Sequence, residues 1–138
     1  MYTIIYHNIP SQEIIDKLTA GISAYAQEQK GLAAIESFAF SISDADNKLY
    51  GGCNGYMYYG CLYIDQIWVE ASMRNQGWGA KLMQAAEELG SLHQCLFASV
   101  NTMDWEALGF YQKLGYEIEF VRTGYLNNSR LYFLRKDF

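Results

Sequence analysis

The chain has 138 residues, enough for one domain with a hydrophobic core, and its 51% hydrophobic and 18% charged residues describe a globular protein. A net charge of −5 offers no basic surface to a phosphate backbone, so we expect no nucleic acid partner, while a cationic substrate would suit this charge. Three cysteines without a CxxC pair and two distant histidines argue against a disulfide framework and a metal site. The sequence has no leader-like or membrane-length apolar run, so we expect a soluble, cytoplasmic protein that binds no membrane.

The first half of the chain predicts a strand, a helix and an antiparallel meander. Residues 2–9 are rich in Ile, Tyr and Thr, as strands are, and Ser11 is the expected N-cap of a helix that ends near Gly31. That helix places five apolar residues on one face: Ile14, Ile15, Leu18, Ile22 and Tyr25. Three further strands are expected at 37–43, at 49–59, where glycines 51, 52 and 55 indicate a bulge or a close backbone approach, and at 61–69, whose apolar run is typical of burial on both faces.

The second half predicts two helices set between strands. One helix follows the turn at 76–79, and Gly90 is expected to end it. Its inner stripe consists of Leu82, Met83, Ala86 and Leu89. The remaining elements are expected as a strand at 93–100, a helix at 105–114, and strands at 116–123 and 131–136. This order predicts a single mixed α/β domain over residues 1–138, with helices covering a central sheet.

The turn at 76–79 has the composition of an anion site. It lies between an apolar strand and an amphipathic helix, and helix N-termini present unpaired N–H groups and partial positive charge. Gly77 and Gly79 let an anion approach the backbone, and Arg74 can add a charge-assisted contact. A tight turn that merely needs glycine is an equal reading of this segment taken alone. It is neither a P-loop, because no GK[ST] follows, nor a dinucleotide fingerprint, because Leu82 replaces the third glycine.

Two stretches carry a resemblance to a known family. WVEASMRNQGWGAKLMQAAEE, which begins at Trp68, resembles the acetyl-CoA-binding motif [RQ]xxGx[GA] of the GNAT superfamily of N-acetyltransferases. EALGFYQKLGYE, at 106–117, is similar to the family's AxxFYxKxGF segment, and the two stand in family order. The resemblance is strongest over residues 61–120. It implies a GNAT-like fold, with a central, mostly antiparallel sheet of six to seven strands flanked by helices, and acetyl-CoA as cosubstrate.

The resemblance also implies a set of cofactor-binding residues. Backbone amides of the turn would bind the CoA pyrophosphate, from Arg74, Asn75, Gln76, Gly77, Trp78, Gly79 and Ala80. The strand residues Ile67, Trp68 and Val69 would bind the pantetheine arm, and one of their N–H groups would face the thioester oxygen. Many family members have Asn at the start of the last helix in contact with pantetheine. Asp104 stands at that position, with Asn101 three residues earlier, so the contact is open between the two.

Tyr111 is the candidate general acid that protonates the leaving CoA thiolate. Its periodicity alone favours a core aromatic on a helix, and the FYQKLGY context, read through the resemblance, favours the catalytic role. The ordinary pKa values of tyrosine and of a thiol lie close enough for the proton transfer.

Asp65 is the candidate acceptor-side residue, as general base through water or as a site for a cationic substrate. It is a carboxylate within an apolar strand, which is costly unless the group is paired or functional, and a structural carboxylate is the alternative. Strand alternation puts Tyr63 on the same face, lining the acceptor site, and turns Trp68 toward the core. Tyrosines 56, 58 and 59 are read either as acceptor-pocket walls or as sheet packing.

These features predict an acetyl-CoA-dependent N-acetyltransferase that acts on a primary amine of a small molecule or peptide by direct attack. The alternative is a CoA-binding sensor or interaction module without catalysis. The identity of the amine does not follow from the sequence, because acceptor loops vary on a constant fold. A homodimer is left open as the assembly.

Overall fold

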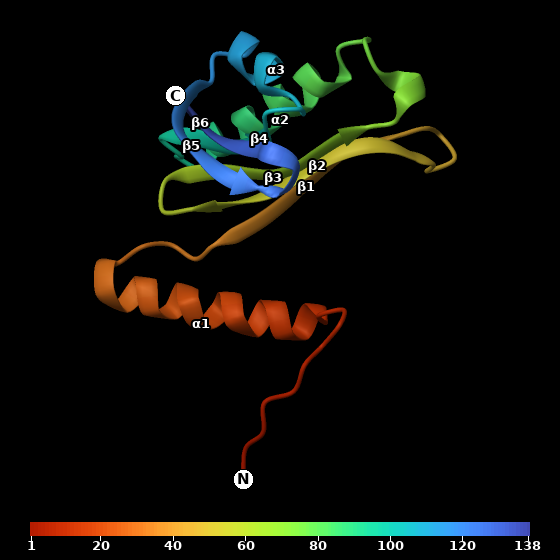
Figure 1. The fold of residues 1–138 in the computed structure, drawn as a ribbon. Coiled ribbons are helices and arrows are strands. Elements are labelled where there is room, and N and C mark those ends of the chain that lie inside the picture. The colour runs from red at the N-terminus through yellow and green to blue at the C-terminus, as the bar shows by residue number, and fades with distance from the viewer. The chain divides into compact units, whose positions relative to one another are not determined.

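The computed structural model describes all 138 residues as two compact units, Met1–Ile35 and Glu36–Phe138 (Figure 1). The first unit holds one helix, α1 (Gln12–Lys30). Ser11 caps it, since its Oγ accepts from the Ile14 N–H at 3.3 Å, and the helix ends at Gly31 in a left-handed conformation with φ 64°. Both predicted ends of this helix are therefore confirmed.

The strand expected at residues 2–9 is not formed. These residues have strand-like composition, but the chain's one sheet does not include them. A strand persists only where a neighbour takes its backbone hydrogen bonds, so composition alone does not make one.

The second unit is built on a six-stranded sheet in the order β1-β2-β3-β4-β6-β5. The strands are β1 (Glu36–Ser43), β2 (Leu49–Tyr58), β3 (Cys61–Val69), β4 (Phe97–Met103), β5 (Glu117–Tyr125) and β6 (Ser129–Asp137). Only β3 and β4 run parallel, and every other neighbouring pair is antiparallel. The expected mixed α/β class with a mostly antiparallel sheet is confirmed.

Helix α2 (Trp78–Leu92) connects the parallel strands β3 and β4, and α3 (Leu108–Lys113) follows β4. Short 3₁₀ turns lie at Ala71–Met73 and Leu126–Asn128. α2 buries Leu82, Met83 and Ala86 in the core, together with sheet residues such as Leu62, Val100 and Leu134.

The single domain expected over 1–138 stays a prediction. No helix of the structure is long and apolar enough to cross a membrane.

Two helix boundaries differ from the prediction. Gly90 does not end α2; it is buried inside the helix, where an added Cβ would lie 3.1 Å from Leu62 Cδ2. Glycine at this position therefore lets α2 pack closely on Leu62 of β3. The last helix begins at Leu108 instead of Trp105, because Thr102 Oγ1 and Glu106 Oε1 accept the N–H groups of Ala107 and Met103 and hold a turn.

A β-bulge in β3 redirects half of that strand. Asn54 pairs with Gln66 and the next residue, Gly55, pairs with Ile64, so Asp65 is the extra residue. A Cβ on Gly55 would collide with the Tyr63 carbonyl oxygen, so the close backbone approach expected at 49–59 is confirmed, while the extra residue of the bulge lies on the neighbouring strand β3. The expected burial of the whole strand is wrong: Cys61–Ile64 is mostly buried, and the residues after the bulge are mostly open.

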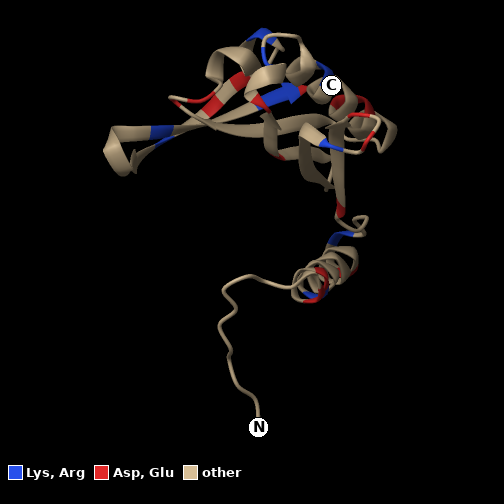
Figure 2. Ribbon diagram, turned by 90° about the vertical axis from the view of Figure 1, so that its right-hand side faces the viewer, with Lys and Arg blue, Asp and Glu red and all other residues tan.

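Charged side chains are distributed over many elements. Lys and Arg positions lie among Asp and Glu positions along the second unit (Figure 2). Several oppositely charged side chains pair, such as Lys136 with Glu87 and Arg130 with Asp104.

Candidate functional site

A pocket of about 880 Å³ opens where the end of β3, the start of α2 and the start of α3 meet. It brings together most of the predicted cofactor-binding residues: Ile67, Trp68, Val69, Arg74, Asn75, Gly77, Trp78, Gly79 and Ala80. Tyr111 lines the same pocket. Gln76, Asn101, Asp104 and Asp65 do not line it.

The N-terminus of α2 has no internal acceptor for its donors. Gly77 is the N-cap with φ 83°, no side chain caps the helix, and no acidic residue stands in its first turn. The first backbone hydrogen bond of the helix runs from the Lys81 N–H to the Gly77 carbonyl oxygen at 3.1 Å. The N–H groups of Gly77, Trp78, Gly79 and Ala80 therefore remain unpaired, and the helix dipole adds positive charge there. This end of α2 can bind an anion.

Arg74 is held beside this helix end. Its Nε donates to the Val69 oxygen at 2.8 Å, and its other guanidinium nitrogens make no hydrogen bond or ion pair with the protein. A guanidinium oriented in this way can add a bidentate contact to an anion in the pocket. Gln76 instead donates from Nε2 to the Ser72 oxygen at 3.3 Å.

The end of β3 has one open edge. β3 pairs with β4 only from Cys61 to Ile64, whereas its pairing with β2 continues to Val69. Backbone groups of residues 67–69 on the β4 side therefore have no strand partner and lie in the pocket wall. An extended ligand can bind along such an edge through backbone hydrogen bonds.

Trp68 was expected in the core, and this expectation is wrong. The bulge at Asp65 shifts the alternation of β3, so that Trp68 is 57% exposed and lines the pocket. Strand alternation predicts the face of a residue only where no extra residue intervenes.

Tyr111 lies on α3 with 5% of its surface exposed. Burial, with the nearby Glu106 carboxylate and Cys53, raises the pKa of Tyr111 to about 12, and no hydrogen bond engages its hydroxyl. The neighbouring Phe110 packs on Gly79, where an added Cβ would lie 3.2 Å from Phe110 Cζ. Gly79, the second glycine of the turn, therefore allows α2 and α3 to pack closely. Because its pKa is raised, the Tyr111 hydroxyl in this pocket is neutral.

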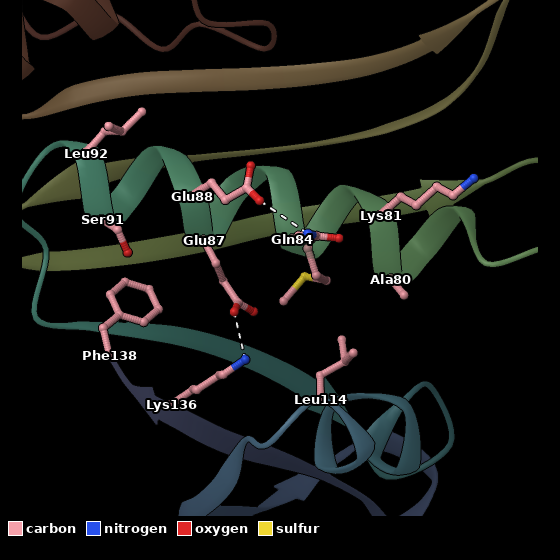
Figure 3. A pocket seen from close by; sticks show the side chains of 11 residues that line it. Ala80, Lys81, Gln84, Glu87, Glu88, Ser91, Leu92, Leu114, Lys136 and Phe138 are labelled. Carbon is pink, nitrogen blue, oxygen red and sulfur yellow. Dashed lines mark hydrogen bonds and ion pairs between the residues drawn. The ribbon is translucent and has the colours of Figure 1, made fainter.

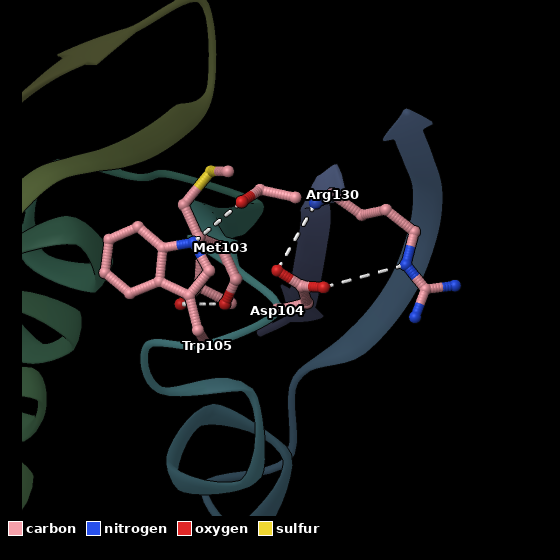
Figure 4. A network of polar contacts seen from close by, with 6 residues as sticks. Met103, Asp104, Trp105 and Arg130 are labelled. Carbon is pink, nitrogen blue, oxygen red and sulfur yellow. Dashed lines mark hydrogen bonds and ion pairs between the residues drawn. The ribbon is translucent and has the colours of Figure 1, made fainter. Parts of the chain in front are cut away.

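Asp104 and Asn101, the two candidates for the pantetheine contact, lie outside the pocket lining. Asp104 Oδ1 accepts from the Arg130 N–H at 3.3 Å, and Oδ2 lies 3.8 Å from Arg130 Nε (Figure 4). These contacts join the end of β4 to the start of β6. Asn101 is on β4, where its Oδ1 is buried without a hydrogen-bond partner.

Asp65 lies on β3 as expected, but it is exposed at the bulge, so the burial expected of this carboxylate is wrong. It lies near Tyr63: burial and then the Asp65 carboxylate raise the pKa of that tyrosine. The Tyr63 ring centroid is 5.2 Å from that of Tyr56, which is 5.2 Å from that of Tyr58. These contacts between rings favour sheet packing for the tyrosine-rich stretch.

Six lining residues of the pocket were not recognised from the sequence as site residues, and two of them, Trp105 and Glu106, have polar side-chain groups. These two were assigned to the first turn of a helix, and the structure places both in the turn before α3, in the pocket wall. Glu106 is the first residue of the quoted EALGFYQKLGYE segment, and no sequence signal of its own marks it as a pocket residue.

A second hollow of about 790 Å³ lies along the later turns of α2, beside Leu114 and the C-terminal residues of β6 (Figure 3). Its carboxylate Glu87 pairs with two protein groups. Lys136 Nζ lies 2.7 Å from Glu87 Oε1, and the Tyr116 hydroxyl donates to Glu87 Oε2 at 3.0 Å. Of the predicted site residues, only Ala80 lines it.

Comparisons with known proteins agree with this architecture. The model of the acetyltransferase (GNAT) family matches residues 18–116. The chain is 34% identical over 89 residues to the blasticidin-S acetyltransferase of Streptomyces morookaense. The aligned segment covers 61% of this chain and 62% of that protein, so the match spans less than two thirds of the relative's length.

Two crystal structures share the fold. A candidate acetyltransferase from Agrobacterium tumefaciens matches with a TM-score of 0.83 and 25% identity, over 99% of this chain and 100% of that chain. An aminoglycoside 6'-N-acetyltransferase complexed with coenzyme A matches with a TM-score of 0.64 and 20% identity, over 74% of this chain and 73% of that chain. Since the family model covers most of the sequence, the chain belongs to the GNAT family of acetyltransferases.

Proposed function

We propose that this protein transfers the acetyl group of acetyl-CoA to a primary amine of a small molecule or peptide. One observation carries the proposal: the unpaired N–H groups at the start of α2 and the free Tyr111 hydroxyl open into the same pocket. An anion site and a proton donor are what binding of CoA and release of its thiol require. Family membership and the acetyltransferase relative named above support acetyl transfer.

The residues of the pocket fit acetyl-CoA as cosubstrate. The pyrophosphate would bind the N–H groups of Gly77–Ala80 and the free guanidinium nitrogens of Arg74. The pantetheine arm would follow the open edge at Ile67–Val69. Acetyl-CoA supplies an activated thioester, and a backbone N–H of this edge would polarise the thioester carbonyl.

The reaction consists of a direct attack. The amine nitrogen forms a bond to the acetyl carbon, the C–S bond breaks, the amine loses one proton to a base, and the departing thiolate receives one proton from the Tyr111 hydroxyl. With its pKa raised to about 12, Tyr111 is protonated at neutral pH, and the same shift makes its hydroxyl a weaker acid than that of an ordinary tyrosine. The pocket contributes further by holding the two reactants in line.

Asp65 remains our candidate for the base, acting through water. It is two residues from the pocket-lining Ile67 on the same strand. Asp65→Asn should lower turnover or raise the Michaelis constant of the amine while leaving acetyl-CoA affinity unchanged. Loss of folding would instead indicate a structural carboxylate. The contact of Asn101 or Asp104 with pantetheine also remains a proposal, and for Asp104 it would have to form beside the existing Arg130 pair.

The test of the function has two readouts on the same protein. Thermal unfolding with acetyl-CoA at 100 times its Kd should report a stabilisation of about 2.7 kcal/mol. Thiol release from acetyl-CoA should then appear with members of an amine panel and be verified by mass spectrometry. Binding without release across the panel would point to the non-catalytic CoA-binding alternative, and absence of binding at millimolar acetyl-CoA would overturn the cosubstrate. A cytoplasmic location stays a prediction.

A further inference from the structure

The pocket that holds Tyr111 contains a single carboxylate. Among its lining residues only Glu106 is acidic, and its Oε1 accepts the Met103 N–H at 2.8 Å. The second oxygen, Oε2, has no donor from the protein. Glu106 is therefore fixed by one oxygen and open at the other, close enough to Tyr111 to affect its titration.

Two tryptophans line the same pocket with large exposed surfaces. Trp68 is 57% exposed and Trp105 is 69% exposed. Trp105 does not rotate freely, because its Nε1 donates to Ser129 Oγ at 3.2 Å, which ties it to the start of β6 (Figure 4). Indole faces are the strongest aromatic partners of cations, so these side chains and the carboxylate favour one kind of ligand group.

A cation at Glu106 is not supplied by the proposed cosubstrate. The phosphates of acetyl-CoA are anionic and its pantetheine arm is neutral, so neither calls for a carboxylate with a free oxygen. The reacting amine is also unsuitable as the permanent partner, because it must be neutral to attack. The remaining source is a second group on the acceptor molecule.

We propose that Glu106, in one pocket with Trp68 and Trp105, selects acceptors that carry a second cationic group, an ammonium or guanidinium, in addition to the amine that is acetylated. The inference rests on the proposed acetyl transfer and names the substrate class of that site. Glu106 is a specificity residue here: it binds a part of the acceptor that does not react. Its backbone contact with Met103 presets the carboxylate before the acceptor arrives.

Glu106→Gln separates this role from a structural one. The amide oxygen of glutamine can still accept the Met103 N–H, so the turn before α3 is retained while the negative charge is lost. Glu117→Gln is the matched control, because Glu117 is exposed at the start of β5 and does not line the pocket. Unchanged stabilisation by acetyl-CoA shows that each variant is folded.

The first arm measures turnover with two primary amines of similar length, 4-aminobutylguanidine and hexylamine. The wild type and Glu117→Gln should favour the guanidine by about tenfold or more in kcat/KM, mainly through KM. Glu106→Gln should lose this preference, so that its kcat/KM values for the two amines become similar. An equal preference in the wild type and Glu106→Gln, or a wild-type preference for hexylamine, would overturn the proposal.

The second arm measures binding of 4-aminobutylguanidine to the CoA-loaded protein by calorimetry, and does not depend on turnover. Affinity should fall about tenfold in Glu106→Gln and stay unchanged in Glu117→Gln. If thiol release fails with every amine while this difference in binding appears, the acetyl transfer is wrong and the cation site stands. If both variants bind the probe as the wild type does, or if the wild type does not bind it, the cation site is wrong.

Discussion

The two hollows beside helix α2 have nearly equal volumes, about 880 and about 790 Å³, and opposite polar chemistry. In the one along the later turns of α2, Glu87 binds both Lys136 and Tyr116. In the one at the start of α2, the backbone N–H groups and the Tyr111 hydroxyl have no protein partner. The two hollows therefore differ little in volume. What distinguishes the hollow at the start of α2 is its unpaired hydrogen-bond donors.

This contrast indicates what each hollow contributes. Paired polar groups gain their stabilisation from the fold itself, so their loss should affect the free energy of unfolding. Unpaired donors stabilise little until a ligand arrives, so their loss should affect binding and turnover. The variants below test this division, beginning with the largest expected effect.

Tyr111→Phe should lower kcat by about 10²- to 10⁴-fold, the usual contribution of general acid catalysis. Phenylalanine has almost the same volume, and the lost hydroxyl makes no hydrogen bond, so stability should change little. The Kd for acetyl-CoA should also change little, because the hydroxyl matters most as charge develops on sulfur. The measurement is single-turnover kinetics, which isolate the chemical step.

Tyr116→Phe is the control for that variant. Tyr116 is a buried tyrosine whose ring centroid lies 5.9 Å from that of Tyr111, but its hydroxyl donates to Glu87 in the other hollow. Its loss should cost about 1 kcal/mol of stability and leave kcat unchanged. If Tyr111→Phe retains wild-type kcat with chemistry rate-limiting, Tyr111 is a core residue and water protonates the thiolate.

Gly77→Asp should weaken acetyl-CoA binding by at least about tenfold, while Gly77→Asn should weaken it much less. Both side chains tolerate the left-handed backbone that Gly77 adopts, with φ 83°, and they have nearly the same size. Only aspartate adds negative charge where the pyrophosphate is expected to bind. Calorimetric titration of both variants with acetyl-CoA measures the difference. Equal affinities would place the pyrophosphate elsewhere.

Lys136→Met should destabilise the protein by about 1–3 kcal/mol and leave acetyl-CoA affinity and kcat unchanged. The change leaves the Glu87 carboxylate, 18% exposed, with the Tyr116 hydroxyl as its one remaining donor. Urea denaturation measures the loss. Adding Glu87→Gln to Lys136→Met should recover part of it, because the unpaired charge is then gone. A fall in acetyl-CoA affinity would contradict the division between the two hollows.

Stability should fall at alkaline pH. Burial raises the pKa of the Cys61 thiol to about 11 and, with Glu106 and Cys53, that of Tyr111 to about 12. A group whose folded pKa is raised contributes stability that is complete below its unfolded pKa, near ~8.5 for a thiol and ~10 for tyrosine, and is lost as the pH rises through the folded value. Urea denaturation from pH 7 to pH 11 should show this fall, and Tyr111→Phe should reduce its part above pH ~10.

The sequence predicted those parts of the fold that local chemistry determines. Ser11 and Gly31 were correctly placed as the ends of α1, and the residue range of β3 was correct, because caps and apolar runs act over a few residues. In the structure Gly77 is the N-cap of α2, and Tyr111 lines the pocket that opens beside it.

The sequence predictions were wrong where contacts between residues far apart in the chain determine the local structure. Gly90 has the composition of a helix stop, but Leu62 on β3 requires a residue without a side chain there. Strand alternation alone puts Trp68 on the core side of β3, but the bulge at Asp65 shifts the alternation and leaves Trp68 exposed. Glu106 has no signal of its own, since its place in the pocket depends on the turn that precedes α3.

The smallest expected effect comes from the capped helix. Ser11 does for α1 what no residue does for α2: its Oγ accepts an N–H of the first turn, and Glu13 adds a favourable charge at that end. Ser11→Ala should therefore cost about 0.5–1 kcal/mol of α1 stability, at the low end for an N-cap because the 3.3 Å bond is long. Ser11→Gly should cost only a few tenths. Helix content followed by circular dichroism in urea measures both, and acetyl-CoA affinity should not change in either. A loss of acetyl-CoA affinity in Ser11→Ala would show that the anion site depends on more than the unpaired donors at the N-terminus of α2.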